Sequence, residues 1–325
     1  MSIPSYQPSS CDRLVREQAE TVFRGEKFRY VRSYYVEPDG RTYTTTALDD
    51  VNYGQIYNEY RKRHGIPFPD DIKRTKEMFG MNNATLTTIL GFGENQIADY
   101  LAGEVPSRTN GKILSMAMDL YVFEKMVDNV RDQLRDSLYE KIKRRIAERK
   151  ARPSDECFRM IYGKTERDLL NGYARQDAGV LKEVILLILC TIGETYETKM
   201  NKLLFYCDMM SYRETGTGMT GLAYMANKYG IIPFRSSLIY SMLEIPRTVY
   251  YGYGIEYSPL CADEKPELTL LTESNKEIIN RVCEKFKSYT SKEISYANHD
   301  EPSWENYVGS NKPIPFDEAF NLTQI

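Results

Sequence analysis

The sequence of 325 residues is long enough for two domains, or for two with a small N-terminal appendage. Its 42% hydrophobic and 27% charged residues are typical of a folded globular protein and exclude wholesale disorder. The net charge of -3 indicates no general affinity for nucleic acid, but it leaves room for a local basic patch.

Segments that target a chain to membranes are not apparent. The most apolar stretch, Val180–Ile192, is interrupted by Lys182 and Glu183, so it predicts a buried helix rather than a membrane span. The first ten residues are polar and contain proline, which does not match a secretory signal. We therefore expect a cytoplasmic protein with no membrane association.

The residues that commonly bind metals or carry out redox chemistry are sparsely placed. The six cysteines include no CxxC pair, so in a reducing compartment they are expected to be free thiols. The two histidines, His64 and His299, lie far apart in the sequence. We therefore predict no metal site and no cofactor.

The first segment, residues 1–66, is predicted to form a small β unit and one helix. Residues 21–46 are rich in β-formers, and Pro38-Asp39-Gly40 lies between their two halves, where Asp-Gly favours a tight turn. This pattern predicts an antiparallel hairpin or a three-stranded sheet. Because an isolated hairpin is marginally stable, we expect it to pack on a helix at residues 53–64.

The second segment, residues 67–118, is predicted to contain four short helices. The first three end at Gly80, Gly91 and Gly103, and the fourth begins after Pro106-Ser107. The second and third helices are joined by the sharp turn Gly91-Phe92-Gly93, which is the layout of a helix-turn-helix. In that motif the residues that open the second helix face the DNA major groove. The candidate DNA-binding residues are Asn95, Gln96, Ser107 and Lys112.

The third segment, residues 119–152, is predicted to be one long connecting helix. Apolar residues recur every three or four positions from Leu120 to Ile146, which also makes this stripe the candidate seam of a homodimer. The basic residues between 141 and 152 have two interpretations. They form either a solvated helix face that leads into a linker at Pro153-Ser154, or a stripe that contacts DNA phosphates.

The last segment, residues 153–325, is predicted to be mostly helical, with a short hairpin at residues 248–257. The fold class is thus mainly α. Only the cluster around His299 and Trp304 resembles a catalytic site, and no GxSxG elbow accompanies it. We interpret His299 as a structural histidine and Trp304 as a core residue rather than a binding anchor, and we predict that the protein is not an enzyme.

Three stretches in the first half carry a resemblance to a known family: Asn52–Arg61 (NYGQIYNEYR), Pro69–Met78 (PDDIKRTKEM) and Leu90–Pro106 (LGFGENQIADYLAGEVP). Through them, residues 20–118 resemble antitoxins of the MqsA or YgiT type, in which a zinc-binding β unit precedes a helix-turn-helix. Residues 35–40 stand where the family has its paired cysteines. The β unit is therefore expected to be held by aromatic packing instead of zinc.

The predicted DNA-reading helix also departs from that family. Asn95 and Gln96 are suitable readers because an amide can bond an adenine edge with two hydrogen bonds. Glu94 and Asp99 on the same helix would repel phosphates, where family members usually have a basic residue. The resemblance thus implies DNA binding, weakened by two carboxylates.

Three further stretches occur in order in the second half: Lys199–Arg213 (KMNKLLFYCDMMSYR), Met219–Pro233 (MTGLAYMANKYGIIP) and Ile294–Tyr307 (ISYANHDEPSWENY). Through them, residues 180–320 resemble the Panacea domain, a module fused to many DNA-binding heads in toxin–antitoxin operons. One departure is Ile231, where a proline commonly stands. The resemblance implies a domain that neutralises a small protein toxin by direct contact.

The two resemblances together imply an antitoxin of a type II toxin–antitoxin system that binds a cognate toxin and, as a homodimer, its operator DNA. Tyrosines are frequent interface anchors and equally frequent core residues. The alternative is a stand-alone transcriptional regulator whose C-terminal domain is a sensor. The candidate partner-binding residues are Lys202, Tyr206, Tyr224, Tyr229, His299 and Trp304.

Overall fold

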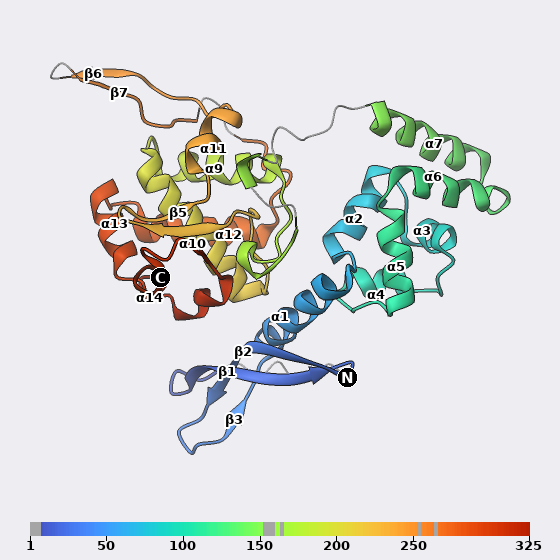
Figure 1. Ribbon diagram of the computed structural model, residues 1–325, viewed down its shortest axis with the longest axis horizontal. Coiled ribbons are helices and arrows are strands. Elements are labelled where there is room, and N and C mark those ends of the chain that lie inside the picture. The colour runs from blue at the N-terminus through green and yellow to red at the C-terminus, as the bar shows by residue number, and fades with distance from the viewer. Residues whose placement is uncertain (1–7, 152–159, 163–165, 253–254, 263–265) are drawn as a thin grey trace. The chain divides into compact units, whose positions relative to one another are not determined.

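The computed structural model describes residues 8–151, 160–162, 166–252, 255–262 and 266–325. These residues are mainly helical, with a small N-terminal sheet and short strands in the C-terminal half, as the fold class predicted (Figure 1). The chain divides into two compact units. Unit 1 contains residues 1–56 and 155–325, and unit 2 contains residues 57–154. None of the described helices has the length and hydropathy that crossing a bilayer requires.

The N-terminal sheet has the strand order β1-β2-β3. Its long hairpin turns at Arg24-Gly25, two residues with φ of 50° and 83°, which is the backbone that a two-residue hairpin requires. The turn that the sequence placed at Pro38-Asp39-Gly40 is confirmed, and it joins the antiparallel strands β2 and β3. Strand β1 and the turn after it were missed, because both faces of β1 are largely exposed. The strands are β1 (Arg13–Phe23), β2 (Glu26–Val36) and β3 (Thr42–Tyr43).

The open edge of β2 is covered by two amide side chains of α1 (Thr46–His64). Gln55 accepts a hydrogen bond from Val31 N at 3.0 Å and donates one to Val31 O at 3.0 Å. One turn earlier, Asn52 pairs in the same way with Ser33 N and O, at 2.8 and 2.9 Å. Strand β3 pairs only with the last two residues of β2, so these amides take the place of a neighbouring strand.

Aromatic packing supports the same sheet, as the sequence predicted. The rings of Tyr35 and Tyr43 stack across β2 and β3 with centroids 5.5 Å apart, and Phe28 is buried. In unit 1 the guanidinium of Arg16 also lies over the ring of Phe320, near the C-terminus, at 6.0 Å. The sheet is therefore held by rings and amides together.

Unit 2 is a bundle of short helices around one apolar cluster that includes Ile72, Leu86, Ile97, Phe123 and Ile142. The four helices expected between residues 69 and 117 are present. The elements are α2 (Pro69–Met78), α3 (Asn83–Leu90), α4 (Gln96–Leu101), α5 (Arg108–Ala117), α6 (Leu120–Asn129), η1 (Arg131–Gln133) and α7 (Asp136–Ala151).

The predicted long connecting helix is wrong. The chain turns back after Asn129, and α7 packs against α6 (Figure 1). The apolar spacing looks continuous because both helices present their stripe to the same cluster, and Phe123, Val127, Ile142 and Ile146 are fully buried there. These side chains are therefore not available for the predicted dimer seam.

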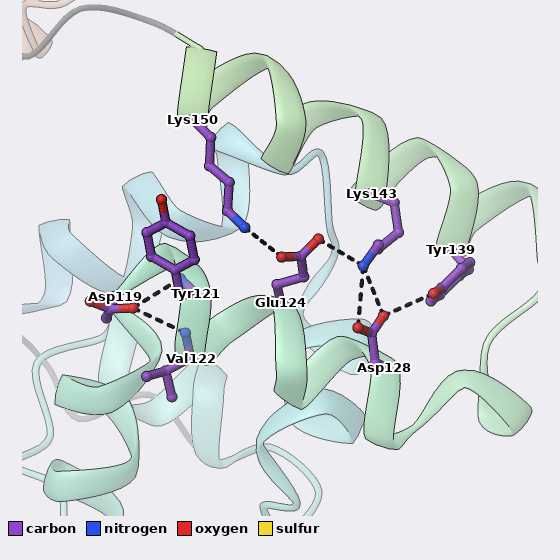
Figure 2. A network of polar contacts seen from close by, with 8 residues as sticks. All are labelled: Asp119, Tyr121, Val122, Glu124, Asp128, Tyr139, Lys143 and Lys150. Carbon is purple, nitrogen blue, oxygen red and sulfur yellow. Dashed lines mark hydrogen bonds and ion pairs between the residues drawn. The ribbon is translucent and has the colours of Figure 1, made fainter.

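Acidic and basic side chains join α6 to α7 (Figure 2). Glu124 lies 2.7 Å from Lys143 Nζ and 2.5 Å from Lys150 Nζ. Lys143 also contacts Asp128 at 3.0 Å, and the hydroxyl of Tyr139 donates to the same carboxylate at 2.8 Å. The two ammonium groups hold the pKa of Glu124 down at about 2.

The remaining basic side chains of α7 divide between the interior and solvent. Arg145 donates to the carbonyls of Glu77 and Met78 at the end of α2, at 3.3 and 3.4 Å, where a cation is favourable. Arg144 is exposed, and its Nε lies 3.8 Å from Glu148 Oε1. The predicted linker at Pro153-Ser154 lies outside the described residues.

The C-terminal part of unit 1 is built around α10, which contacts α9, α12, α13, β5 and η3. Strands β4, β5 and β8 form one sheet, and β6 and β7 form the hairpin that the sequence predicted. The elements are η2 (Leu169–Asn171), α9 (Ala178–Ile192), α10 (Glu197–Thr215), β4 (Tyr224–Asn227), β5 (Gly230–Pro233), α11 (Ser236–Met242), β6 (Tyr250–Gly252), β7 (Ile255–Tyr257), α12 (Glu273–Phe286), α13 (Ser291–His299), α14 (Pro302–Tyr307), β8 (Pro313–Ile314) and η3 (Phe316–Asn321).

We predict that Gln55→Ala lowers the free energy of unfolding of unit 1 by about 2 to 4 kcal/mol, because it leaves the N–H and C=O of Val31 without partners in a buried place. Urea denaturation of the full chain measures the change. The matched control is Gln18→Ala on the exposed face of β1, for which we expect about 0.5 kcal/mol or less. Equal effects of the two substitutions would contradict this account of the β2 edge.

We predict that Glu124→Gln destabilises unit 2 by about 1 kcal/mol at neutral pH, a small value because solvent screens these partly exposed pairs. The folded-state pKa of Glu124 is about 2, below its ordinary 4.5, so the stabilisation is complete above pH 4.5 and is lost as the pH falls from 4.5 towards 2. Urea unfolding at several pH values measures the difference from the wild type. A difference that did not shrink on acidification would show that the ion pairs are not its cause.

Candidate functional site

The strongest concentration of buried polar groups in unit 1 lies on α10. All residues of this helix from Lys199 to Tyr212 are buried, including two lysines and one aspartate. Charged groups at such depth are costly unless they are paired or hydrogen-bonded. The partners of Lys199, Lys202 and Asp208 therefore show what α10 organises.

Asp208 binds the glycine-rich loop that follows α10. Its carboxylate accepts hydrogen bonds from Met219 N at 2.6 Å, from Thr220 N and Oγ1 at 2.8 and 2.5 Å, and from the Tyr224 hydroxyl at 2.6 Å. Burial raises the pKa of Asp208, and these donors oppose the rise. The loop at residues 215–221, which lacks the lysine of a nucleotide cradle, is thus a structural turn held by one carboxylate.

Lys199 closes the C-terminal end of α12. Its Nζ donates to the carbonyls of Lys287 at 3.1 Å and Tyr289 at 2.6 Å. Burial lowers the pKa of Lys199. This lysine therefore has a clear structural role.

Lys202 differs from Asp208 and Lys199, because its Nζ is buried and has no hydrogen-bond partner among the described residues. Burial lowers the pKa of Lys202 to about 8. Tyr206, one turn along α10, is fully buried, and its hydroxyl faces Asn298 and Glu301 without the geometry of a hydrogen bond. Burial is also the main cause that raises the pKa of Tyr206.

His299 and Trp304 lie at the partly exposed side of this cluster. Their rings stack with centroids 4.2 Å apart, and Trp304 Nε1 donates to Asn227 O in β4 at 2.8 Å. Burial, and after it the charge of Lys202, lowers the pKa of His299. Stacking on the indole of Trp304 fixes the ring of His299, which agrees with a structural histidine.

The six predicted partner-binding residues are placed very differently. Lys202, Tyr206 and Tyr224 are fully buried, so a partner could reach them only if the domain opened. Tyr229 is 61% exposed at the turn between β4 and β5. His299 and Trp304 are partly exposed.

An exposed aromatic surface that sequence reasoning did not select lies on the β6–β7 hairpin, which extends from the helices of its unit (Figure 1). Tyr251 is 79% exposed and Ile255 is 68% exposed. Tyr250 and Tyr257 stack across the two strands with centroids 5.3 Å apart. Glu194 anchors the hairpin by accepting from the Tyr250 hydroxyl at 2.9 Å.

The four predicted DNA-binding residues lie along α4 and α5 in unit 2. Gln96 Oε1 accepts from Gly93 N at 3.1 Å and from Asn110 Nδ2 at 3.2 Å. The Ser107 hydroxyl accepts from Asn110 N at 3.1 Å and caps α5. Asn110, which sequence reasoning missed, therefore links Gln96 to Ser107, and the spacing of Ser107 and Asn110 is the signal that marks it.

The other two candidates are open to solvent. Asn95 adopts φ of 70° at the start of α4 and is exposed, and Lys112 is exposed on α5. Gln96 can offer only its amide nitrogen freely, because its oxygen already accepts two hydrogen bonds. Within the described parts of the chain, no three His, Cys, Asp or Glu side chains gather as metal ligands would.

Comparison with known proteins identifies one domain. Residues 200–305 match the family model described as "Antitoxin SocA-like, Panacea domain". The match includes most of α10, the β6–β7 hairpin and α13. It confirms the Panacea resemblance, whereas the resemblance of residues 20–118 to MqsA-type antitoxins stays a prediction. No curated protein and no solved structure matches the chain.

We predict that Lys202→Met stabilises the protein by up to about 3 kcal/mol at pH 7, because the wild type buries an ammonium group without a counter-ion. The folded-state pKa of about 8 lies below the ordinary 10.5, so the cost is full below pH 8 and falls as the pH rises from 8 to 10.5. Urea unfolding in a zwitterionic buffer measures the gap, and a gap that did not depend on pH would contradict the prediction.

Proposed function

We propose that this chain, which carries a SocA-like Panacea domain, is the antitoxin of a type II toxin–antitoxin pair and neutralises a cognate protein toxin by binding it directly. The observation that carries the proposal is the exposed aromatic hairpin β6–β7, which lies within the residues that match the family. The family description supplies the class of partner, and the hairpin supplies a surface suited to a protein.

The hairpin has the composition of a protein interface. Val249, Tyr250, Tyr251, Ile255 and Tyr257 are all exposed on a segment of few residues. Tyrosine side chains bury a large area at low rotamer cost, and they are enriched among the residues that dominate binding energy. Exposed clusters of this kind commonly mark interaction sites in a folded protein.

The base of the hairpin is fixed, which lowers the entropic cost of binding. Arg247 pairs with Glu197 at the start of α10 and donates to Ser258 O at 3.1 Å. Backbone bridges join Leu260 to Thr195 and to Arg247. The aromatic side chains are therefore presented from an anchored support.

A second function, autoregulation through operator DNA, is supported by the exposed side chains at the start of α4 and α5 in unit 2. Asn95 can offer an amide to a base edge, and Lys112 can contact a phosphate. Glu94 and Asp99 are also exposed and oppose phosphate binding. We propose weak operator binding by a homodimer, whose seam must be sought outside the buried stripe of α6 and α7.

The alternative is a stand-alone transcriptional regulator, with the Panacea domain as a sensor. The two proposals differ in whether a toxin is encoded beside this gene. A small adjacent reading frame that kills cells alone, and is harmless when this chain is present, supports the antitoxin. Neither proposal requires an enzymatic activity.

We predict that Tyr251→Ser combined with Ile255→Ser weakens toxin binding by about tenfold to a hundredfold, because both side chains are exposed anchors. Isothermal titration calorimetry with the product of the adjacent gene measures the Kd. The matched control is Tyr296→Ser, which removes an equally apolar exposed ring from α13 and is expected to leave Kd unchanged. Loss of affinity in the control alone would move the interface to α13.

We predict that Asn95→Ala together with Gln96→Ala abolishes sequence-specific DNA binding and leaves toxin neutralisation intact. Because Gln96 also supports the Gly93 turn, Asn95→Ala alone is the cleaner test of base recognition. Lys112→Ala should weaken binding to all sequences and lower the salt slope by about one, whereas Lys125→Ala on α6 should do neither. Electrophoretic mobility shifts at several salt concentrations measure these effects, and loss of neutralisation in a folded variant would refute the division of roles.

A further inference from the structure

Several buried polar atoms of unit 1 have no hydrogen-bond partner among the described residues, and they concentrate on α10 and α13. They include Lys202 Nζ and Tyr206 Oη on α10, and Asn298 Nδ2 and His299 Nε2 on α13. Buried polar groups in folded proteins are almost always satisfied, so such a group indicates a partner of another kind. We therefore ask which chemical group can form hydrogen bonds with these atoms at the same time.

The backbone at Gly230 brings α10 and α13 together. Gly230 has φ of 100°, and a Cβ placed there would lie 2.7 Å from Asn298 Oδ1 and 3.2 Å from Lys202 Nζ. The side chains of Lys202 and Asn298 therefore both pack against the backbone at Gly230. Tyr206 lies one turn after Lys202 on α10, and His299 follows Asn298 on α13.

The groups around this point offer donors, and the nearby acceptors are already used. Asn298 Oδ1 accepts from Ile231 N at 2.5 Å, which fixes the amide so that its Nδ2 is the free atom. Glu301 accepts from Thr323 N at 2.8 Å and from Gln324 N at 3.2 Å. The ammonium of Lys202, the phenol of Tyr206, the amide nitrogen of Asn298 and the ring nitrogen of His299 remain, and among these four groups only the ammonium is a charged donor.

We propose that Lys202, Tyr206 and Asn298 form a buried binding site for a small carboxylate anion. A carboxylate supplies the negative charge that Lys202 lacks, and its two oxygens accept the hydrogen bonds that Tyr206 and Asn298 can donate. The anion is small because all three side chains are buried. The site does not depend on the antitoxin function, since it lies inside the domain and involves no exposed residue of the hairpin.

Acetate is the probe, and the full chain is unfolded and refolded in a zwitterionic buffer so that the buried site can equilibrate. A ligand that binds only the folded state raises the urea midpoint as its concentration rises beyond Kd. We expect a saturable acetate-dependent increase for the wild type and none for Lys202→Met. Sodium methanesulfonate at equal ionic strength gives the salt baseline.

Two variants keep the test decisive. Lys199→Met removes the other buried lysine of α10, whose Nζ is satisfied by carbonyls, and it should retain the acetate effect. Tyr206→Phe removes one unpaired hydroxyl without changing charge, and it should weaken acetate binding several-fold while the protein stays folded, even if Lys202→Met does not fold. An equal acetate effect in Lys202→Met or Tyr206→Phe, or no saturable effect in the wild type, would overturn the proposal and leave ordered water as the partner.

Discussion

The burial of charged side chains on α10 is the constraint that the rest of the C-terminal half satisfies. Asp208 and Lys199 each require partners inside the domain, and the structure supplies them from the loop before β4 and from the end of α12. The two charges thus tie segments distant in sequence to one helix. Because the energy of these contacts comes from groups that water cannot reach, their loss would cost more than the loss of a surface pair.

Polar side chains of helix α1 also supply hydrogen bonds to segments that are distant in the sequence. Asn52 and Gln55 form hydrogen bonds with the edge of β2. Asn58 and Arg61, further along the helix, belong to unit 2. There Arg61 donates to Asn58 Oδ1 at 3.2 Å and to Gly103 O at 2.6 Å. Asn52 and Gln55 therefore support the N-terminal sheet in unit 1, and Arg61 supports the loop after α4 in unit 2.

The short helices of unit 2 could be predicted because glycine and proline mark their ends. The reversal of the chain after Asn129 could not be predicted, because the spacing of apolar residues is the same for one long helix and for two helices that share a core. The turn at Pro38-Asp39-Gly40 was predicted, whereas the turn at Arg24-Gly25 was not, because Arg24 adopts a positive φ that its residue type does not favour. The Panacea domain could be recognised from its ordered motifs. The burial of Lys202 and Tyr206 could not be foreseen, since it depends on α13 and on β5, which are far away in the sequence.

The account assigns toxin binding to the surface of the β6–β7 hairpin and none of it to the buried face of α10. Amide hydrogen exchange of the full chain, with and without the small protein encoded beside it, tests this division most directly. We expect new protection in β6, β7 and the residues that anchor them, with α10 exchanging slowly and equally in both states. Protection that changes in α10 while the hairpin is unaffected would contradict the assignment.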